Sequence, residues 1–143
     1  MGCHPGRSSG FRRPRRKSQE MPHYIAFFTY AKGAWHGMVE HPENREEAAR
    51  KVIDAAGGRL LAFYWMLGDH DGFAIFEAAD AVAAAAVSAA VSASGRISHV
   101  KTVELLGSRE VRRSLEAAKV IATVYEPPGG FVEEWRAEYD VLG

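Results

Sequence analysis

Two strand-like segments, His23–Tyr30 and Arg59–Leu67, carry apolar side chains at both sets of alternating positions. Successive side chains of a strand point to opposite faces of a sheet, so a strand with one wet face should alternate apolar and polar residues. In the second segment we expect one face to hold Leu60, Ala62, Tyr64 and Met66, and the other to hold Leu61, Phe63, Trp65 and Leu67. These strands therefore predict a sheet that is covered on both faces.

The order of the predicted elements restricts the fold further. Strand-forming residues bounded by turn residues predict four strands, at His23–Tyr30, Arg59–Leu67, Phe73–Glu77 and Ile97–Leu105. Pro42 is placed to begin a helix that runs to about Ala56, and Asp80 is placed to cap a second helix over Ala81–Ala93. A β-α-β-β-α-β order with right-handed crossovers puts both helices on one face of a four-stranded antiparallel sheet. The sequence thus predicts an α+β, ferredoxin-like domain.

Composition divides the chain into three parts. Residues 1–20 contain six basic residues and one acidic residue, with Phe11 as the one large apolar residue, so we expect a disordered basic leader. Residues 21–107 hold the ferredoxin-like domain, and residues 108–143 form a C-terminal helical extension. The Gly-rich segment Lys32–Glu40 is expected to form irregular turns rather than a helix.

Charge and cysteine content limit the classes of molecule that the chain is expected to bind and the compartment in which it is expected to occur. The chain has a formal net charge of zero, and a +5 leader (six basic residues against one acidic) leaves −5 on the remainder. We therefore expect no nucleic-acid partner, because such binding needs clustered positive charge. The single cysteine, Cys3, excludes an internal disulfide and fits a reducing compartment. No apolar run reaches the roughly 18 residues of a membrane span, so we expect no membrane partner and a cytoplasmic location.

The second face of the predicted sheet needs a cover. Two helices cover one face, and four apolar strands would expose a patch larger than the few hundred Å² that soluble monomers usually tolerate. We expect an identical sheet from a second copy of the chain to cover it, so that the protein is a homodimer through its open sheet face. The C-terminal helices are the alternative cover.

Several motifs together resemble the GYD-domain family. They are the segment Tyr24–Phe28, the helix Arg45–Ala56 ending in Gly57-Gly58, and the segment Phe63–Asp71. The resemblance covers roughly residues 22–107. It implies a ferredoxin-like unit that pairs sheet to sheet into a dimeric α/β barrel, and it implies no settled activity. The family's Gly-x-Tyr-Asp motif is matched by Gly68 and Asp71, whereas His70 occupies the tyrosine position, so a role for that hydroxyl does not carry over.

Asp71 and His70 are the candidate catalytic residues. An imidazole between the carboxylates of Asp69 and Asp71 is suited to acid–base chemistry near neutral pH. The structural alternative is a hairpin turn from Gly68 to Gly72, in which Asp71 caps backbone N–H groups and His70 is solvated.

The candidate ligand pocket consists of aromatic residues and the turn glycine. Such residues line pockets for flat organic molecules but also form ordinary cores and interfaces; they are Tyr64, Trp65, Trp35, His36 and Gly68. The histidines lack metal-ligand spacing, so we predict neither a metal site nor a cofactor.

Two functional hypotheses follow. The first is a non-catalytic homodimer that binds a small apolar or aromatic molecule, or a partner, in a cavity between the two sheets. The second is a small dimeric-barrel enzyme, of the isomerase or monooxygenase type, that uses Asp71 with His70 or Tyr64.

Overall fold

The computed structural model describes residues 21–129, which form eight helices and strands. In chain order these are β1 (His23–Tyr30), α1 (Lys32–Glu40), α2 (Arg45–Ala55), β2 (Arg59–Trp65), β3 (Gly72–Glu77), α3 (Ala81–Ala93), β4 (Ile97–Leu105) and α4 (Ser108–Ile121). The predicted leader at residues 1–20 lies outside the described residues, as does the end of the predicted C-terminal extension.

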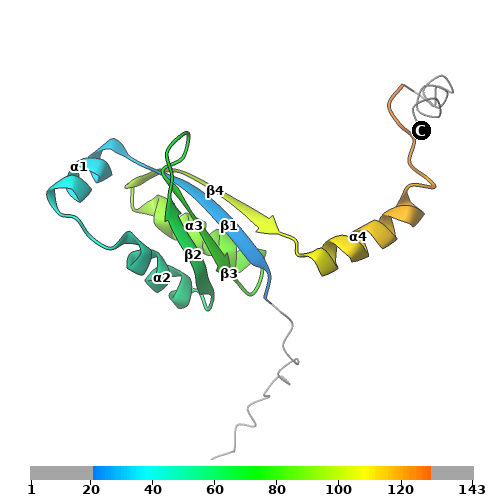
Figure 1. Cartoon of the computed structure of the whole chain (residues 1–143), viewed down its shortest axis with the longest axis horizontal. Helices are drawn as coiled ribbons and strands as arrows, with labels where there is room; N and C mark the ends of the chain where they lie inside the picture. Colours follow the sequence, from blue (N-terminus) through cyan, green and yellow to red (C-terminus); the bar gives the residue numbers. More distant parts are fainter. Residues whose placement is uncertain (1–20, 130–143) are drawn as a thin grey trace, which may run out of the picture. The chain divides into compact units, whose positions relative to one another are not determined.

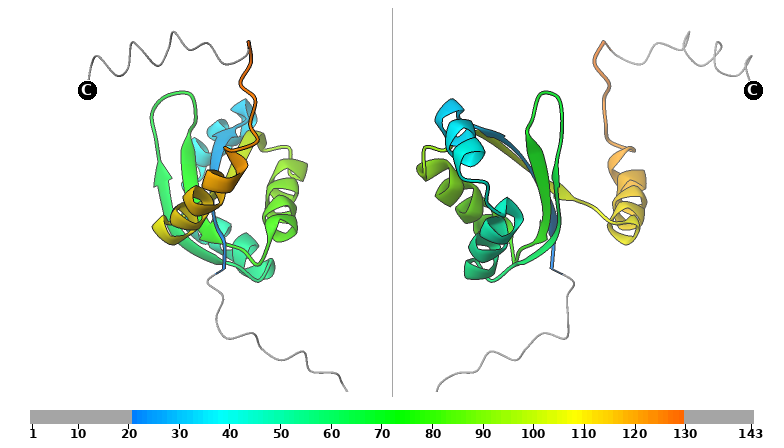
Figure 2. Two further views of the ribbon diagram at one scale, coloured as in Figure 1. Left: turned by 90° about the vertical axis from the view of Figure 1, so that its right-hand side faces the viewer. Right: turned by 60° about the vertical axis from the view of Figure 1, so that its left-hand side comes forward.

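The four strands form one antiparallel sheet in the order β2-β3-β1-β4 (Figure 1). Helices α2 and α3 lie on the same face of this sheet (Figure 2). The α+β fold with a ferredoxin-like order of elements is therefore confirmed. The chain divides after Leu105 into two compact units, and α4 belongs to the second.

The core lies between the sheet and the two helices. Tyr24 from β1, Leu60 from β2 and Phe76 from β3 are buried against side chains of α2 and α3. Phe76 is the largest fully buried residue, at 1% exposure. We call this side of the sheet the helix face and the opposite side the open face.

Two capped ends fix where the helices begin. The Asp80 carboxylate accepts a hydrogen bond from the Ala83 N–H at 2.9 Å and caps α3 as predicted. Helix α2 begins at Arg45 rather than Pro42, because Asn44 caps it by accepting the Glu47 N–H at 3.1 Å.

The segment Lys32–Glu40 is a helix, so the prediction of irregular turns is wrong. Trp35 supplies the tertiary contacts that outweigh the low helix propensity of two glycines. Its indole N–H donates to the Asp71 carboxylate at 3.3 Å, and its ring packs edge-on against Tyr30.

Strand β2 contains a bulge that changes the predicted faces. Leu60 pairs with Phe76 and Ala62 pairs with Ile75, so Leu61 has no partner in β3. The extra residue reverses the orientation of the side chains that follow it in β2. Phe63 and Trp65 therefore lie on the helix face with Leu60, whereas Ala62 and Tyr64 lie on the open face. The strand also ends at Trp65, two residues earlier than predicted.

Candidate functional site

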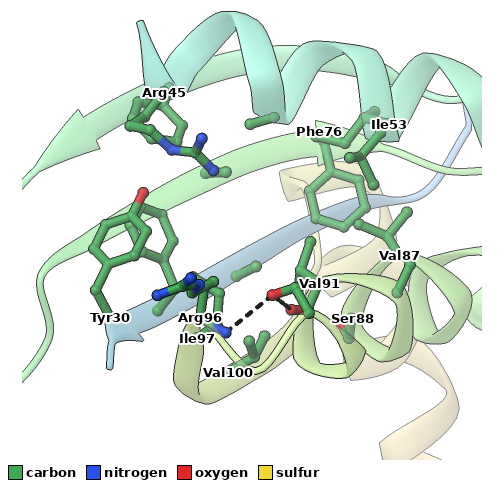
Figure 3. Close-up of a pocket in the computed structure, with 18 residues that line it drawn as sticks. Tyr30, Arg45, Ile53, Phe76, Val87, Ser88, Val91, Arg96, Ile97 and Val100 are labelled. Atoms are coloured by element: carbon green, nitrogen blue, oxygen red, sulfur yellow. Dashed lines mark hydrogen bonds between the residues drawn. The ribbon is translucent and has the colours of Figure 1, made fainter. Parts of the chain in front are cut away.

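A cavity of about 280 Å³ lies between the helix face of the sheet and helices α2 and α3 (Figure 3). Small side chains create this space, because alanines stand where larger residues would complete the packing. They are Ala26 and Ala74 on the sheet, Ala49 on α2 and Ala90 on α3. Larger apolar side chains, among them Ile53, Phe76 and Val87, form the wall at one end.

Three polar side chains gather at the other end of this cavity. Tyr30 is the last residue of β1, Arg45 is the first residue of α2, and Arg96 immediately precedes β4. Figure 3 shows the Tyr30 hydroxyl directed toward the Arg45 side chain, with Arg96 beside the Tyr30 ring. A backbone hydrogen bond holds Arg96 next to the end of β1, because the N–H of Ala31, the residue after Tyr30, donates to the Arg96 carbonyl at 2.9 Å. We call these three residues the polar end.

The polar end also borders a second hollow, of about 320 Å³, that lies against α1. Tyr30, Arg45 and Arg96 line both spaces, so they stand at the junction between the apolar cavity and a hollow whose lining is relatively more polar. A molecule in the cavity would meet these three side chains at that junction.

The Tyr30 hydroxyl remains protonated at neutral pH. Burial raises the pKa of this phenol above its ordinary value of 10.0, while the adjacent Arg45 guanidinium lowers it in part. The carboxylates of Asp71 and Glu43 raise the pKa further. The hydroxyl is therefore a hydrogen-bond donor at the polar end.

Asp71 holds the backbone and α1 in position. One oxygen of its carboxylate accepts the Tyr30 N–H at 2.7 Å and the Trp35 indole N–H at 3.3 Å. The Asp71 N–H in turn donates to the Phe28 carbonyl at 2.9 Å. Asp71 thus fixes the end of β1, and through it the position of Tyr30.

His70 lies on the open face, away from the contacts of Asp71. Its ring packs on Phe27 and on His99, with centroid distances of 5.3 and 6.1 Å. Its Nδ1 atom is buried and has no hydrogen-bond partner among the residues that the structure describes. Within that part of the chain no hydrogen bond joins His70 to Asp71, so the structure does not bring the two together as an acid–base pair, and their catalytic use stays a prediction.

The motif that contains Asp71 also lies within a segment that matches a protein-family model. The family described as GYD domain matches residues 24–115, which is more than half of the chain. This chain belongs to the GYD domain family. None of the curated proteins matches it.

The residues predicted to line a pocket are spread over this GYD domain. Trp35 and Trp65 pack together at a centroid distance of 5.7 Å beside Tyr30, and Tyr64 packs on Phe73 on the open face. His36 is exposed on α1, and Gly68 has a positive φ of 137° in the β2–β3 turn. None of the five lines the cavity between the sheet and the helices.

Sequence reasoning missed all three residues of the polar end. One signal was available for Arg45, since a cation in the first turn of a helix is unfavourable next to the positive end of the helix dipole. Helix stability therefore does not account for an arginine at position 45. Nothing in the local sequence marks Arg96 or separates Tyr30 from the other aromatic residues of β1.

Residues 21–129 contain neither a group of metal ligands nor a membrane-spanning helix. In this region, no three side chains of His, Cys, Asp or Glu are grouped as metal ligands would be. The helices there are also too short or too polar to cross a bilayer.

Proposed function

We propose that this GYD domain is a homodimer that binds a small, largely apolar molecule in the cavity between its sheet and helices α2 and α3. The cavity is the observation that supports ligand binding. Its volume of about 280 Å³ is close to the lower limit of natural ligand pockets, and its wall is mainly apolar with a few convergent polar groups. Its position differs from the sequence-based expectation, which placed a binding cavity between two sheets.

The homodimer is proposed from the open face. A row of rings crosses this face from β2 to β4, with neighbouring centroids 5.3 to 6.2 Å apart. This aromatic row consists of Tyr64, Phe73, Phe27, His70 and His99. Ile25, Ile75 and Val103 extend the apolar surface around it. Within residues 21–105, no helix lies on this face (Figure 2), and an isologous dimer would use the same patch on both copies.

The cavity is tested by filling it. Ala49 lines the cavity, and an Ala49→Phe substitution would place a ring in the space that a ligand needs. Octan-1-ol serves as a neutral apolar probe in isothermal titration calorimetry. We expect wild-type protein to bind it and Ala49→Phe to lose binding.

The matched control for this test is Ala55→Phe, at an exposed position on the same helix that does not line the cavity. It should bind octan-1-ol as wild type does. Unchanged binding by folded Ala49→Phe, or no binding by wild type, would overturn the cavity as the ligand site.

The dimer is tested by placing a charge on the open face. Tyr64 is 61% exposed, so Tyr64→Glu is compatible with a folded protomer but would bury a carboxylate in the proposed interface. Sedimentation equilibrium should give twice the mass of one chain for wild type and a single-chain mass for Tyr64→Glu. Ala86→Glu, on an exposed position of α3, adds the same charge elsewhere and should remain dimeric. A wild-type protein of single-chain mass contradicts this half of the proposal.

A further inference from the structure

The polar end contains hydrogen-bonding capacity that the described protein groups do not use. Other hydroxyls on the cavity wall are already paired. Ser88 shares a hydrogen bond with Thr102 at 2.6 Å, and the Ser94 hydroxyl both donates to the Val91 carbonyl at 2.7 Å and accepts from the Arg96 N–H at 3.1 Å. These serines therefore offer little to a ligand.

The Arg45 side chain is only partly satisfied. Its Nε is buried and has no hydrogen-bond partner among the described residues. One terminal nitrogen lies 3.5 Å from the Glu43 carboxylate, which is itself 59% exposed and faces water. A buried guanidinium N–H without an acceptor is unfavourable, and an acceptor in the cavity would relieve that cost.

Arg96 adds a second guanidinium. Among residues 21–129, no carboxylate lies within ion-pair distance of its side chain. The nearby carboxylates are already engaged, since Glu43 contacts Arg45 and Asp71 accepts the Tyr30 and Trp35 N–H groups. The polar end thus offers two guanidinium groups and a protonated phenol at the mouth of an apolar cavity.

We propose that the cavity selects a small carboxylate with an apolar body. The carboxylate would lie between Arg45 and Arg96 with the Tyr30 hydroxyl as a third donor, and the apolar body would extend toward Ile53, Phe76 and Val87 (Figure 3). Guanidinium groups match a carboxylate in geometry and charge, and such charge-assisted hydrogen bonds are about twice as strong as neutral ones. This inference rests on the proposed cavity function and adds the chemical class of the ligand.

The test compares two probes that differ in the head group and share a chain of the same length. Octanoate carries the carboxylate and octan-1-ol does not, and both are titrated by calorimetry at pH 7. We expect wild-type protein to bind octanoate at least about tenfold more tightly, the scale expected for one charge-assisted interaction that is partly exposed. Equal affinity for the two probes would overturn the inference.

A double variant and a control variant test whether the preference for octanoate depends on the polar end. The double variant Arg45→Met/Arg96→Met keeps most of the apolar side-chain length and removes both guanidinium groups. It should lose the preference for octanoate and keep its affinity for octan-1-ol, which also shows that it is folded. Arg50→Met is the control, because Arg50 lies on α2, pairs with Glu46 at 3.7 Å and does not line the cavity.

The outcomes separate this inference from the function on which it rests. A preference for octanoate that survives in the double variant would place the anion elsewhere and overturn the inference. Binding of octan-1-ol without binding of octanoate would support the proposed cavity function and contradict a carboxylate as the ligand's head group. Failure of both probes to bind wild-type protein would remove both proposals.

Discussion

The two faces of the sheet are both apolar, yet they pack differently. On the helix face, Tyr24, Leu60 and Phe76 are buried beneath α2 and α3. On the open face, Phe27 and Phe73 remain half-buried, and Tyr64 is 61% exposed. The alternation of side chains along β1 and β3 produces this division, because neighbouring residues point to opposite faces.

The comparison shows that apolar character alone does not determine how well a face is packed. The helix face has a cover but also a cavity, because alanines on both the sheet and the helices are too small to fill the space. The open face has a continuous aromatic row and no cover within residues 21–105. This difference is the basis for proposing ligand binding at one face and self-association at the other.

The sharpest test of this division compares two phenylalanines of β3. Phe76→Ala removes a ring that is 1% exposed and should lower the free energy of unfolding by about 4 kcal/mol. Phe73→Ala removes a half-buried ring from the open face, so its main effect should be weaker dimerisation. Urea unfolding and sedimentation measure the two effects separately. Equal losses of unfolding free energy in both variants would mean that the faces are not packed differently.

A second test adds a methyl group to the helix face. A Cβ at Gly72 would lie 2.5 Å from Cζ of Phe28 and 2.7 Å from the Tyr64 carbonyl oxygen, so Gly72→Ala must displace a core ring or the β2 backbone. We expect a loss of about 2–3 kcal/mol in urea unfolding, in the range of overpacked cores.

Gly37→Ala is the control for that substitution. A Cβ there meets no atom within 4 Å, and the residue lies inside α1. Replacing a helical glycine by alanine should stabilise the protein by about 0.5–1 kcal/mol. Similar losses in both variants would show that crowding at Gly72 is not the cause.

Local patterns were sufficient to predict most of the fold. Uninterrupted strand formers defined β1 and β4 to the residue, and Asp80 marked the start of α3. The bulge at Leu61 was not predictable, because every residue from Leu60 to Leu67 is apolar or aromatic and no turn residue marks the extra position. Helix α1 was missed because its stability depends on a distant acceptor for Trp35.

The candidate site was less predictable than the fold. The prediction concentrated on Asp69-His70-Asp71 because titratable residues that are adjacent in sequence suggest shared chemistry. In the structure the Asp71 carboxylate binds the end of β1 and α1, while His70 packs on Phe27 on the open face. The polar end joins residues that are 15 and 51 positions apart (Tyr30 to Arg45, and Arg45 to Arg96), and only the folded sheet and helices bring them together.

The contacts of Asp71 with the end of β1 and with α1 provide a third prediction. Asp71→Ala leaves the part-buried Tyr30 N–H without its acceptor, so we expect a loss of about 2 kcal/mol in unfolding free energy. Hydrogen exchange should also show faster exchange of the Tyr30 amide and of the Trp35 indole N–H. Asp69→Ala, at an exposed position of the same turn, should change neither quantity. Unaltered protection of Tyr30 in Asp71→Ala would contradict the anchoring role.

The smallest expected effect concerns the charged edge of the open face. The Glu77 carboxylate accepts two hydrogen bonds from Arg59, at 3.1 and 3.2 Å, and contacts His23 at 3.1 Å. The hydrogen bond with Arg59 is the main cause that lowers the pKa of Glu77 below its ordinary value of 4.5, with His23 as a further contribution. Because the charged form is favoured in the folded state, this stabilisation is present above about pH 4.5 and is lost as the pH falls through the lowered pKa.

Glu77→Gln should therefore lower the unfolding free energy at pH 7 by about 0.5–1 kcal/mol, a modest value because Arg59 is 67% exposed. The difference between variant and wild type should shrink as the pH is lowered from 5 to 3 in urea titrations. A matched pair in α2, Glu46 with Arg50, is exposed on both sides, and Glu46→Gln should lower the unfolding free energy at pH 7 by less than Glu77→Gln does. If the two variants lose the same unfolding free energy at pH 7, the contact between Arg59 and Glu77 at the edge of the open face stabilises the protein no more than an exposed ion pair on a helix.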